Sequence, residues 1–127
     1  MNQPVPPTRI RIDFVSDVSC PWCAIGLNAL EQALGRLDGE LQADIHLQPF
    51  ELNPQLPPGG EDATEHLIRK YGSSAEQVEA NRGVLRERGE AVGFHFDLER
   101  RSRVYNTFDA HRLLHWAGLQ GRQLPLK

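Results

Sequence analysis

Hydrophobic positions near the start of the chain first alternate with polar ones and then recur at helical spacing. Ile10, Ile12 and Phe14 alternate with charged residues, and this pattern predicts a short strand over residues 10–15. The next apolar positions step by four, three, four and three residues; they are Cys23, Leu27, Leu30, Leu34 and Leu37. This spacing predicts an amphipathic helix over residues 24–37 with one buried face.

A second strand is predicted over residues 43–52, where apolar and polar side chains alternate again. Pro49 lies near its far end and cannot donate to a strand ladder, so we expect the pairing to stop there. Residues 9–53 therefore form a βαβ unit, and such parallel crossovers are nearly always right-handed. Residues 1–8, which are rich in proline, are expected to be a disordered lead-in.

The chain changes character after residue 53, where a segment rich in proline and glycine precedes a charged, helical part. Three further helices are predicted, over residues 64–71, 75–92 and 107–117. We expect Thr64 to cap the first of these helices, Ser74 and Gln77 to form a capping box on the second, and Asn106 or Thr107 to begin the third. Residues 93–98 alternate in polarity, but we expect an extended loop there.

Composition and charge exclude several classes of function. The 127 residues suffice for one ordinary domain, 39% of them are hydrophobic and the net charge is −3. A mildly acidic chain is poorly suited to bind nucleic acid or anionic lipid. It also lacks the roughly 18 consecutive apolar residues that a membrane helix needs. The N-terminus does not resemble a signal peptide, so we expect a cytoplasmic protein without nucleic acid or membrane partners.

The two cysteines, Cys20 and Cys23, lie at the junction between the first strand and the first helix, separated by Pro21 and Trp22. Free backbone N–H groups and the helix dipole favour an anion at a helix start, so we expect the pKa of Cys20 to fall below that of a free thiol. Cys23 lies one turn further on, within reach of a disulfide. Proline is suited to the first helical turn because no N–H is needed there.

This placement predicts redox catalysis by the cysteine pair. Cys20 would be the nucleophile that forms a mixed disulfide with a protein client or a small thiol, and Cys23 would resolve it. Pro21 and Trp22 would set local rigidity, access and redox poise, and Trp22 should be partly exposed and contact clients. The pattern leaves open whether the working direction is oxidation, reduction or isomerisation.

Three other interpretations of the cysteines remain: a structural zinc site, a structural disulfide and a pair of buried, inert thiols. A structural zinc ion needs about four ligands, and none of the histidines has a suitable spacing to the single cysteine pair. A structural disulfide is unusual in a reducing compartment. We therefore expect no metal and no structural disulfide.

Other residues admit both a functional and a structural interpretation. His111 and His115 have a metal-binding spacing, but the glutamate of the H-E-x-x-H motif is absent, which favours packing or capping roles. Residues 99–103 carry a charged cluster that we interpret as solvated surface, with anion binding as the alternative. Four large aromatic residues are interpreted as core of the helical part rather than as a substrate groove: Phe94, Phe96, Phe108 and Trp116.

Three segments of the sequence together resemble a known family. Residues 10–26 (IRIDFVSDVSCPWCAIG), 49–54 (PFELNP) and 106–117 (NTFDAHRLLHWA) are similar to DsbA-type proteins with a thioredoxin fold. The FrnE-like branch is the closer match. This branch is related to 2-hydroxychromene-2-carboxylate isomerase and to kappa-class glutathione transferase.

The resemblance implies an α/β, thioredoxin-like βαβ unit followed by an incomplete helical insertion over residues 54–127. It also implies thiol–disulfide oxidoreductase activity at Cys20 and Cys23, with no cofactor beyond the redox-active disulfide. The isomerase and transferase relatives carry serine at the position of Cys20 and bind glutathione, so Cys20 favours disulfide exchange. Asn53 resembles a position that helps hold glutathione in those relatives, although a turn asparagine is an equal alternative.

The chain departs from the family pattern after the helical insertion. The family has a cis-proline loop and a closing ββα half, and neither is found in the sequence up to Lys127. We therefore expect an N-terminal fragment that covers its apolar surface as a homo-oligomer or a swapped assembly. A glutathione-dependent isomerase or transferase and a non-catalytic binding module remain the alternative functions.

Overall fold

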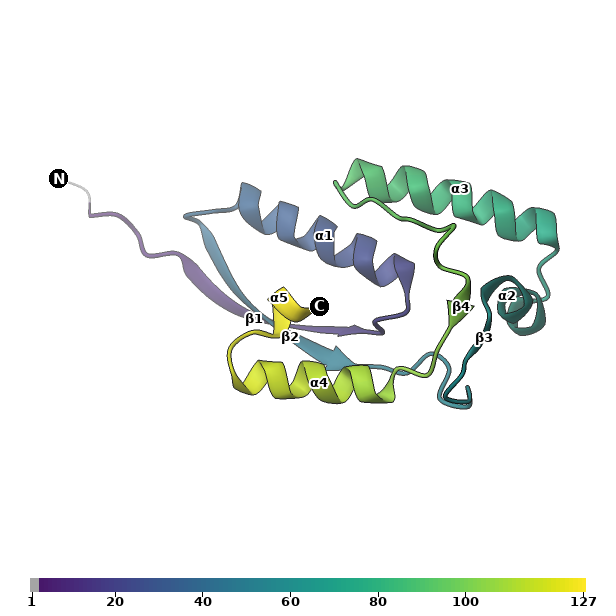
Figure 1. The fold of residues 1–127 in the computed structure, drawn as a ribbon. Coiled ribbons are helices and arrows are strands. Elements are labelled where there is room, and N and C mark those ends of the chain that lie inside the picture. Colours follow the sequence, from purple (N-terminus) through teal and green to yellow (C-terminus); the bar gives the residue numbers. More distant parts are fainter. Residues whose placement is uncertain (1–2) are drawn as a thin grey trace.

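The structure, a computed structural model, describes residues 3–127. Its elements, in chain order, are β1 (Thr8–Ser16), α1 (Pro21–Arg36), β2 (Leu41–Pro49), β3 (Glu61–Asp62), α2 (Ala63–Tyr71), α3 (Ala75–Ala91), β4 (Arg103–Val104), α4 (Phe108–Leu119) and α5 (Gln123–Leu126) (Figure 1). This mixture of helices and small sheets confirms the predicted α/β class with an added helical segment.

The first three elements form the predicted βαβ unit. β1 and β2 pair in parallel over nine residues each, from Thr8 opposite Leu41 to Ser16 opposite Pro49. The ladder stops at Pro49, as expected from a residue without an N–H. α1 lies on one side of the two strands and α4 on the other (Figure 1). The Cys20–Cys23 segment is thereby placed at the end of β1.

Helix α1 begins three residues earlier than the predicted boundary, at Pro21, with Cys20 as the N-cap. Proline at the first helical position loses no hydrogen bond, which is why the helix includes it. Within the predicted apolar stripe, Leu27 is buried, whereas Leu37 is 40% exposed. The two strands thus cover only part of the apolar face of α1.

The caps of α2 and α3 agree only in part with the sequence prediction. Asp62, and not Thr64, caps α2: its Oδ1 accepts a hydrogen bond from the Glu65 N–H at 2.9 Å. The capping box of Ser74 and Gln77 on α3 is confirmed. Asp62 takes the capping role because α2 begins at Ala63, directly after the short strand β3, so that Asp62 is the residue just before the first helical turn.

Two short strands, β3 before helix α2 and β4 after helix α3, were not predicted from the sequence. β3 and β4 pair antiparallel, with Glu61 opposite Val104. Beside this pairing, Leu56, Ala63 and Val104 form a small buried apolar cluster. Strands of two residues are too short to show alternation, so their pairing cannot be recognised from sequence pattern.

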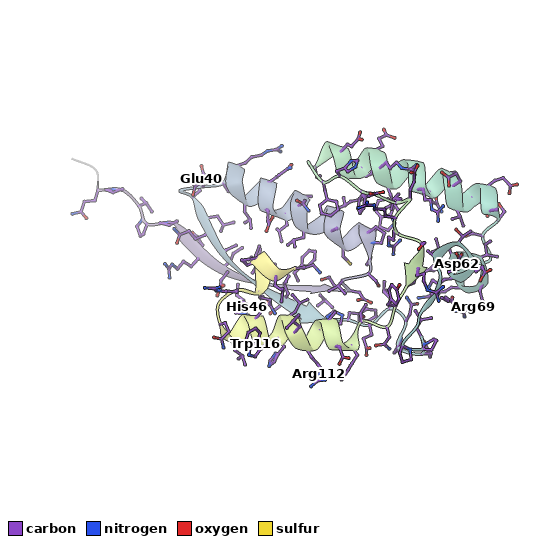
Figure 2. All side chains as sticks on the ribbon, viewed as in Figure 1. Glu40, His46, Asp62, Arg69, Arg112 and Trp116 are labelled. Atoms are coloured by element: carbon purple, nitrogen blue, oxygen red, sulfur yellow. The ribbon has the colours of Figure 1, made fainter. Side chains whose placement is uncertain are left out.

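Helix α4 buries one face against the rest of the molecule and exposes the other. The buried face carries His111, Leu114 and Ala117. Phe108 and Trp116 are 56% and 58% exposed, so the prediction that they belong to the core is wrong. Both fall on the opposite face because the helix register is fixed by the three buried residues. Figure 2 shows the side chain of Arg112 pointing away from the strands on this outer face.

The short helix α5, which was not predicted, occupies the outer edge of β2. The side-chain amide of Gln123 accepts from the Leu47 N–H at 2.9 Å and donates to the Leu47 carbonyl at 3.1 Å. It therefore takes the place of a neighbouring strand at one residue of that edge. None of the helices found between residues 3 and 127 has the length and apolar character needed to cross a membrane.

Candidate functional site

The cysteine pair lies where β1 gives way to α1. The Cys20 N–H donates to the Asp17 carbonyl at 3.3 Å, and the Cys23 N–H donates to the Cys20 carbonyl at 3.2 Å. These bonds fold the segment into one helical turn that places the two cysteines near each other. Both cysteines are free and half-buried. The arrangement is suited to closing a disulfide within a single turn.

Burial raises the pKa of the Cys20 thiol, and the neighbouring Cys23 thiol raises it further. The backbone N–H groups of Cys23 and Trp22 act in the opposite direction but do not outweigh burial. The prediction of a lowered pKa for Cys20 is therefore wrong. Withdrawal of the thiolate from water exceeds the stabilisation that the helix start provides.

A buried carboxylate lies three residues before Cys20. The side chain of Asp17 is 1% exposed. Its Oδ2 accepts from the Leu52 N–H at 2.8 Å, and its Oδ1 lies 3.2 Å from Nε2 of His111. Burial alone would raise the pKa of Asp17, but hydrogen bonds from the Leu52 N–H and the Thr107 side chain lower it below the ordinary value. Asp17 is thus held as a carboxylate at neutral pH.

His111 joins this carboxylate to helix α4. Its Nε2 lies 3.2 Å from Asp17 Oδ1 and 3.1 Å from the Phe50 carbonyl oxygen. Both of these partners only accept, so Nε2 carries the hydrogen. His111 therefore has a packing and hydrogen-bonding role, as the sequence favoured, while His115 is exposed. Through Asp17, the loop before Cys20 is hydrogen-bonded both to the segment after β2 and to helix α4.

Arg101 connects the helical segment to the cysteine turn. Its Nη2 donates to the Ser19 carbonyl at 2.6 Å, across 82 residues of chain. Arg101 also lines a cavity of about 360 Å³ together with Cys20, Trp22 and Asn53, whose remaining walls are mainly apolar. Cys20 faces this cavity, and Cys23 is not among its lining residues. A substrate in the cavity would therefore lie against Cys20 rather than Cys23.

The structure brings most of the predicted site residues together. Cys20, Pro21, Trp22 and Asn53 all line this cavity. Trp22 is 52% exposed, in accord with the expectation of partial exposure. The Asn53 Oδ1 accepts a hydrogen bond from Lys70 Nζ at 2.7 Å, which orients its amide at the cavity wall. The functional roles assigned to these residues remain predictions.

Asp17, His111 and Arg101 belong to the site but were not predicted as parts of it from the sequence. Asp17 lies in the short segment between the predicted first strand and Cys20, and Arg101 belongs to the cluster interpreted as solvated surface. Their partners lie between 35 and 94 residues away along the chain, so no local spacing marks them. In residues 3–127, no group of three or more His, Cys, Asp and Glu side chains could hold a metal ion.

Comparisons with known proteins agree with the predicted thioredoxin-like fold. The sequence profile described as a DSBA-like thioredoxin domain matches residues 11–126. The crystal structure of a probable DsbA oxidoreductase from Streptomyces coelicolor is similar, with 35% identity and a TM-score of 0.77. The similarity covers 89% of this chain and 48% of that one, so the chain spans about half the length of this relative. No curated protein sequence matches the chain.

Proposed function

Because this chain belongs to the family of DSBA-like thioredoxin domains, we propose that it acts as a dithiol–disulfide oxidoreductase through Cys20 and Cys23. One observation carries the proposal: two free thiols lie within one helical turn at the start of α1, and Cys20 opens into a cavity. A family of thiol–disulfide oxidoreductases and a vicinal cysteine pair together support exchange chemistry at this position.

In the oxidising direction, the Cys20–Cys23 disulfide accepts two electrons from a client dithiol. A client thiolate attacks the sulfur of Cys20, the bond between Cys20 and Cys23 breaks, and Cys23 leaves as a thiolate that takes up a proton. The second client thiolate then attacks the client sulfur of the mixed disulfide. The bond between that sulfur and Cys20 breaks, and Cys20 is released as a thiolate. The client gains a disulfide, and the protein is left with two thiols.

In the reducing direction the same steps run backwards. The Cys20 thiolate attacks a client disulfide and releases one client thiolate. Cys23 then loses its proton and attacks Cys20, which releases the second client thiolate and leaves the Cys20–Cys23 disulfide. Either direction needs Cys20 to be the accessible sulfur, and its position on the cavity wall supports that assignment. Pro21 and Trp22 line the same cavity and would contact the client.

Trapping of the mixed disulfide tests this assignment. The chain with Cys23→Ser keeps Cys20 but cannot resolve, so it should accumulate a mixed disulfide with a cysteine-containing peptide disulfide, detected by intact mass. The chain with Cys20→Ser should accumulate much less. Equal trapping by the two variants, or none by either, would contradict the proposal.

A glutathione-dependent reaction at the same site is the second candidate. The observation that favours it is the position of Asn53 on the wall of the Cys20 cavity, held there by Lys70. Calorimetry with reduced glutathione should then show binding that Asn53→Ala abolishes. Gln55→Ala is the matched control, because Gln55 is exposed two residues away and does not line this cavity. Absence of binding to the unaltered chain excludes this candidate.

A further inference from the structure

Arg101 is a partly desolvated cation that forms no salt bridge with a carboxylate among residues 3–127. Several arginines form salt bridges with Asp or Glu side chains: Arg11, Arg69, Arg82, Arg86, Arg100 and Arg112. Within residues 3–127, those without such a bridge, apart from Arg101, are all exposed: Arg9, Arg36, Arg88, Arg103 and Arg122. Arg101 is half-buried, and burial lowers its pKa. A cation withdrawn from water in this way needs hydrogen-bond acceptors, and a nearby anion stabilises it further.

Cys20 is the group that can supply this anion. When ionised, the Cys20 thiol attracts the Arg101 guanidinium and raises its pKa, whereas Arg82 repels it. The guanidinium is also fixed beside Cys20, because its Nη2 donates to the carbonyl of the preceding residue, Ser19, at 2.6 Å. The segment between α3 and β4, which carries Arg101, runs past the N-terminal end of α1 (Figure 1).

We propose that Arg101 is a positioning residue for the cysteine pair, which holds the turn before Cys20 and stabilises the Cys20 thiolate by its charge. This inference rests on the proposed function, because it concerns the form of Cys20 that takes part in disulfide exchange. Burial makes that thiolate unfavourable, and its attraction to the Arg101 guanidinium would offset part of this penalty. The helical segment therefore contributes to the reactivity of a cysteine that the βαβ unit carries.

Other ionisable groups also face Cys20 and have to be separated from Arg101. Cys23 lies on the same helix and raises the pKa of Cys20. Lys127, which donates to Ser16 Oγ at 2.9 Å, is attracted by both thiols when they ionise. Asp17 is engaged by Leu52 and His111. On the cavity wall, His66 is bound to Glu61 at 2.6 Å. Variants that differ only at Arg101 share all of these other groups, so a difference between such variants reports on Arg101.

The experiment measures ionisation of Cys20 in the full chain with Cys23→Ser, which leaves Cys20 as its sole cysteine. The rate of alkylation by iodoacetamide, followed across pH, reports the thiolate fraction. Arg101→Gln should shift the midpoint to higher pH and slow alkylation at neutral pH by about tenfold, the change that corresponds to one pKa unit. Arg101→Lys keeps the charge and should retain most of the unaltered rate.

Arg100→Gln is the matched control, because the side chain of Arg100 is 88% exposed and pairs with Asp97. It should leave the midpoint unchanged. The inference is overturned if Arg101→Gln leaves the midpoint in place, if Arg101→Lys shifts it as far as Arg101→Gln does, or if Arg100→Gln shifts it equally. Should Arg101→Gln fail to fold, Arg101→Lys decides the matter: a midpoint near that of the parent supports the inference, and a large shift overturns it.

The proposed function is tested separately by formation of the Cys20–Cys23 disulfide in the chain with both cysteines. In the reaction with oxidised dithiothreitol, two thiols become one disulfide, and the reagent gains the two electrons and two protons. If this disulfide forms while Arg101→Gln leaves the thiol midpoint unchanged, only the role of Arg101 fails. If the disulfide does not form but the midpoint moves, the proposed function fails and the electrostatic effect of Arg101 remains.

Discussion

Asp17 holds a negative charge inside the protein, directly before the redox turn. Its two oxygens are engaged by the Leu52 N–H and by Nε2 of His111. A carboxylate buried without such partners would tend to take up a proton, since burial alone favours its neutral form. Three separate segments of the chain therefore depend on this one side chain for their position: the turn before Cys20, the end of β2 and helix α4.

Replacement of Asp17 by alanine should destabilise the protein by about 3 kcal/mol, because it leaves the Leu52 N–H and the His111 ring without their buried partner. Urea unfolding of Asp17→Ala measures this loss. Asp109→Ala is the control, since the side chain of Asp109 is 88% exposed and pairs with Arg112, which is 72% exposed. A loss no greater for Asp17→Ala than for Asp109→Ala would contradict the role given to Asp17.

The lowered pKa of Asp17 predicts how stability depends on pH. Because its pKa in the folded state lies below the ordinary value of 3.8, the unfolded chain binds more protons than the folded one as pH falls. The stabilisation by Asp17 is therefore complete above the ordinary value and is lost as pH drops through the folded-state pKa. The difference in unfolding free energy between the parent and Asp17→Asn, measured by urea titration at several pH values, should shrink in acid. A difference independent of pH contradicts this assignment.

The raised pKa of Cys20 has the opposite effect on the pH dependence of folding stability. A thiol with a higher pKa in the folded state keeps its proton while the unfolded chain releases it, so its contribution favours folding at neutral pH and is lost as pH rises above the unfolded value. The alkylation midpoint of Cys20 in the Cys23→Ser chain should accordingly lie above that of the same thiol in urea. A midpoint that is lower in the folded chain would contradict the dominance of burial over the helix start.

At this scale, the sequence identifies the cysteines but not their surroundings. Cys20 and Cys23 are recognised because the whole motif lies within four residues at a strand-to-helix junction. Asp17 and Arg101 act on that motif through partners brought close only by folding. Their sequence contexts, a turn and a charged cluster, are those of ordinary surface residues. The direction of the pKa shift of Cys20 was missed for the same reason, since burial depends on the complete fold.

Among the secondary-structure elements, helix α3 shows how a residue that weakens a helix can be required by packing. Gly83 and Gly89 both lower helix propensity, and the sequence does not distinguish them. In the structure, a Cβ on Gly89 would lie 2.6 Å from the Phe94 carbonyl oxygen and 2.7 Å from the Phe96 ring, whereas Gly83 has nothing within 4 Å. Gly89 therefore lets the segment after α3 return closely along the helix.

The two glycines should respond in opposite ways to alanine. Gly89→Ala should lower the unfolding free energy by about 1–3 kcal/mol, because the new methyl group overlaps backbone and aromatic atoms. Gly83→Ala, its control on the same helix, should raise the unfolding free energy by up to about 1 kcal/mol from propensity alone. Thermal or urea unfolding of both variants measures the contrast. Equal effects of the two substitutions would contradict the packing role of Gly89.

The elements predicted correctly are those whose side-chain pattern is repeated over several turns or along a whole strand. β1, α1 and β2 satisfy that condition. The capping box of α3 is recognised for another reason, because Ser74 and Gln77 form a fixed motif within four residues. β3 and β4 do not, because each has two residues and they pair across some 40 residues of chain. α5 contains Pro125 within a single turn, and proline is ordinarily taken as a sign against helix. Its position depends instead on the contact of Gln123 with Leu47.

For the whole molecule, the main question is what covers its apolar surface. Large apolar side chains are more than half exposed along the outer face of α4: Phe108, Leu113, Trp116 and Leu119. β1 pairs only with β2 among the residues from 3 to 127, and Val15 on that strand is 60% exposed. Contiguous apolar patches of this kind usually mark contact surfaces, and unpaired strand edges favour association.

We therefore expect the chain to self-associate, as the sequence suggested from its small sheet. Light scattering over a range of concentrations should give a mass above that of the monomer. If the outer face of α4 is the contact, Leu113→Glu together with Trp116→Glu should shift the equilibrium towards monomer, because burial of two carboxylates in an apolar contact is strongly unfavourable. Arg112→Gln, on the same helix and 72% exposed, is the control that should change little. A single monomeric species for the unaltered chain, together with a cooperative melt, would show that the two strands and α4 suffice to stabilise this fold alone.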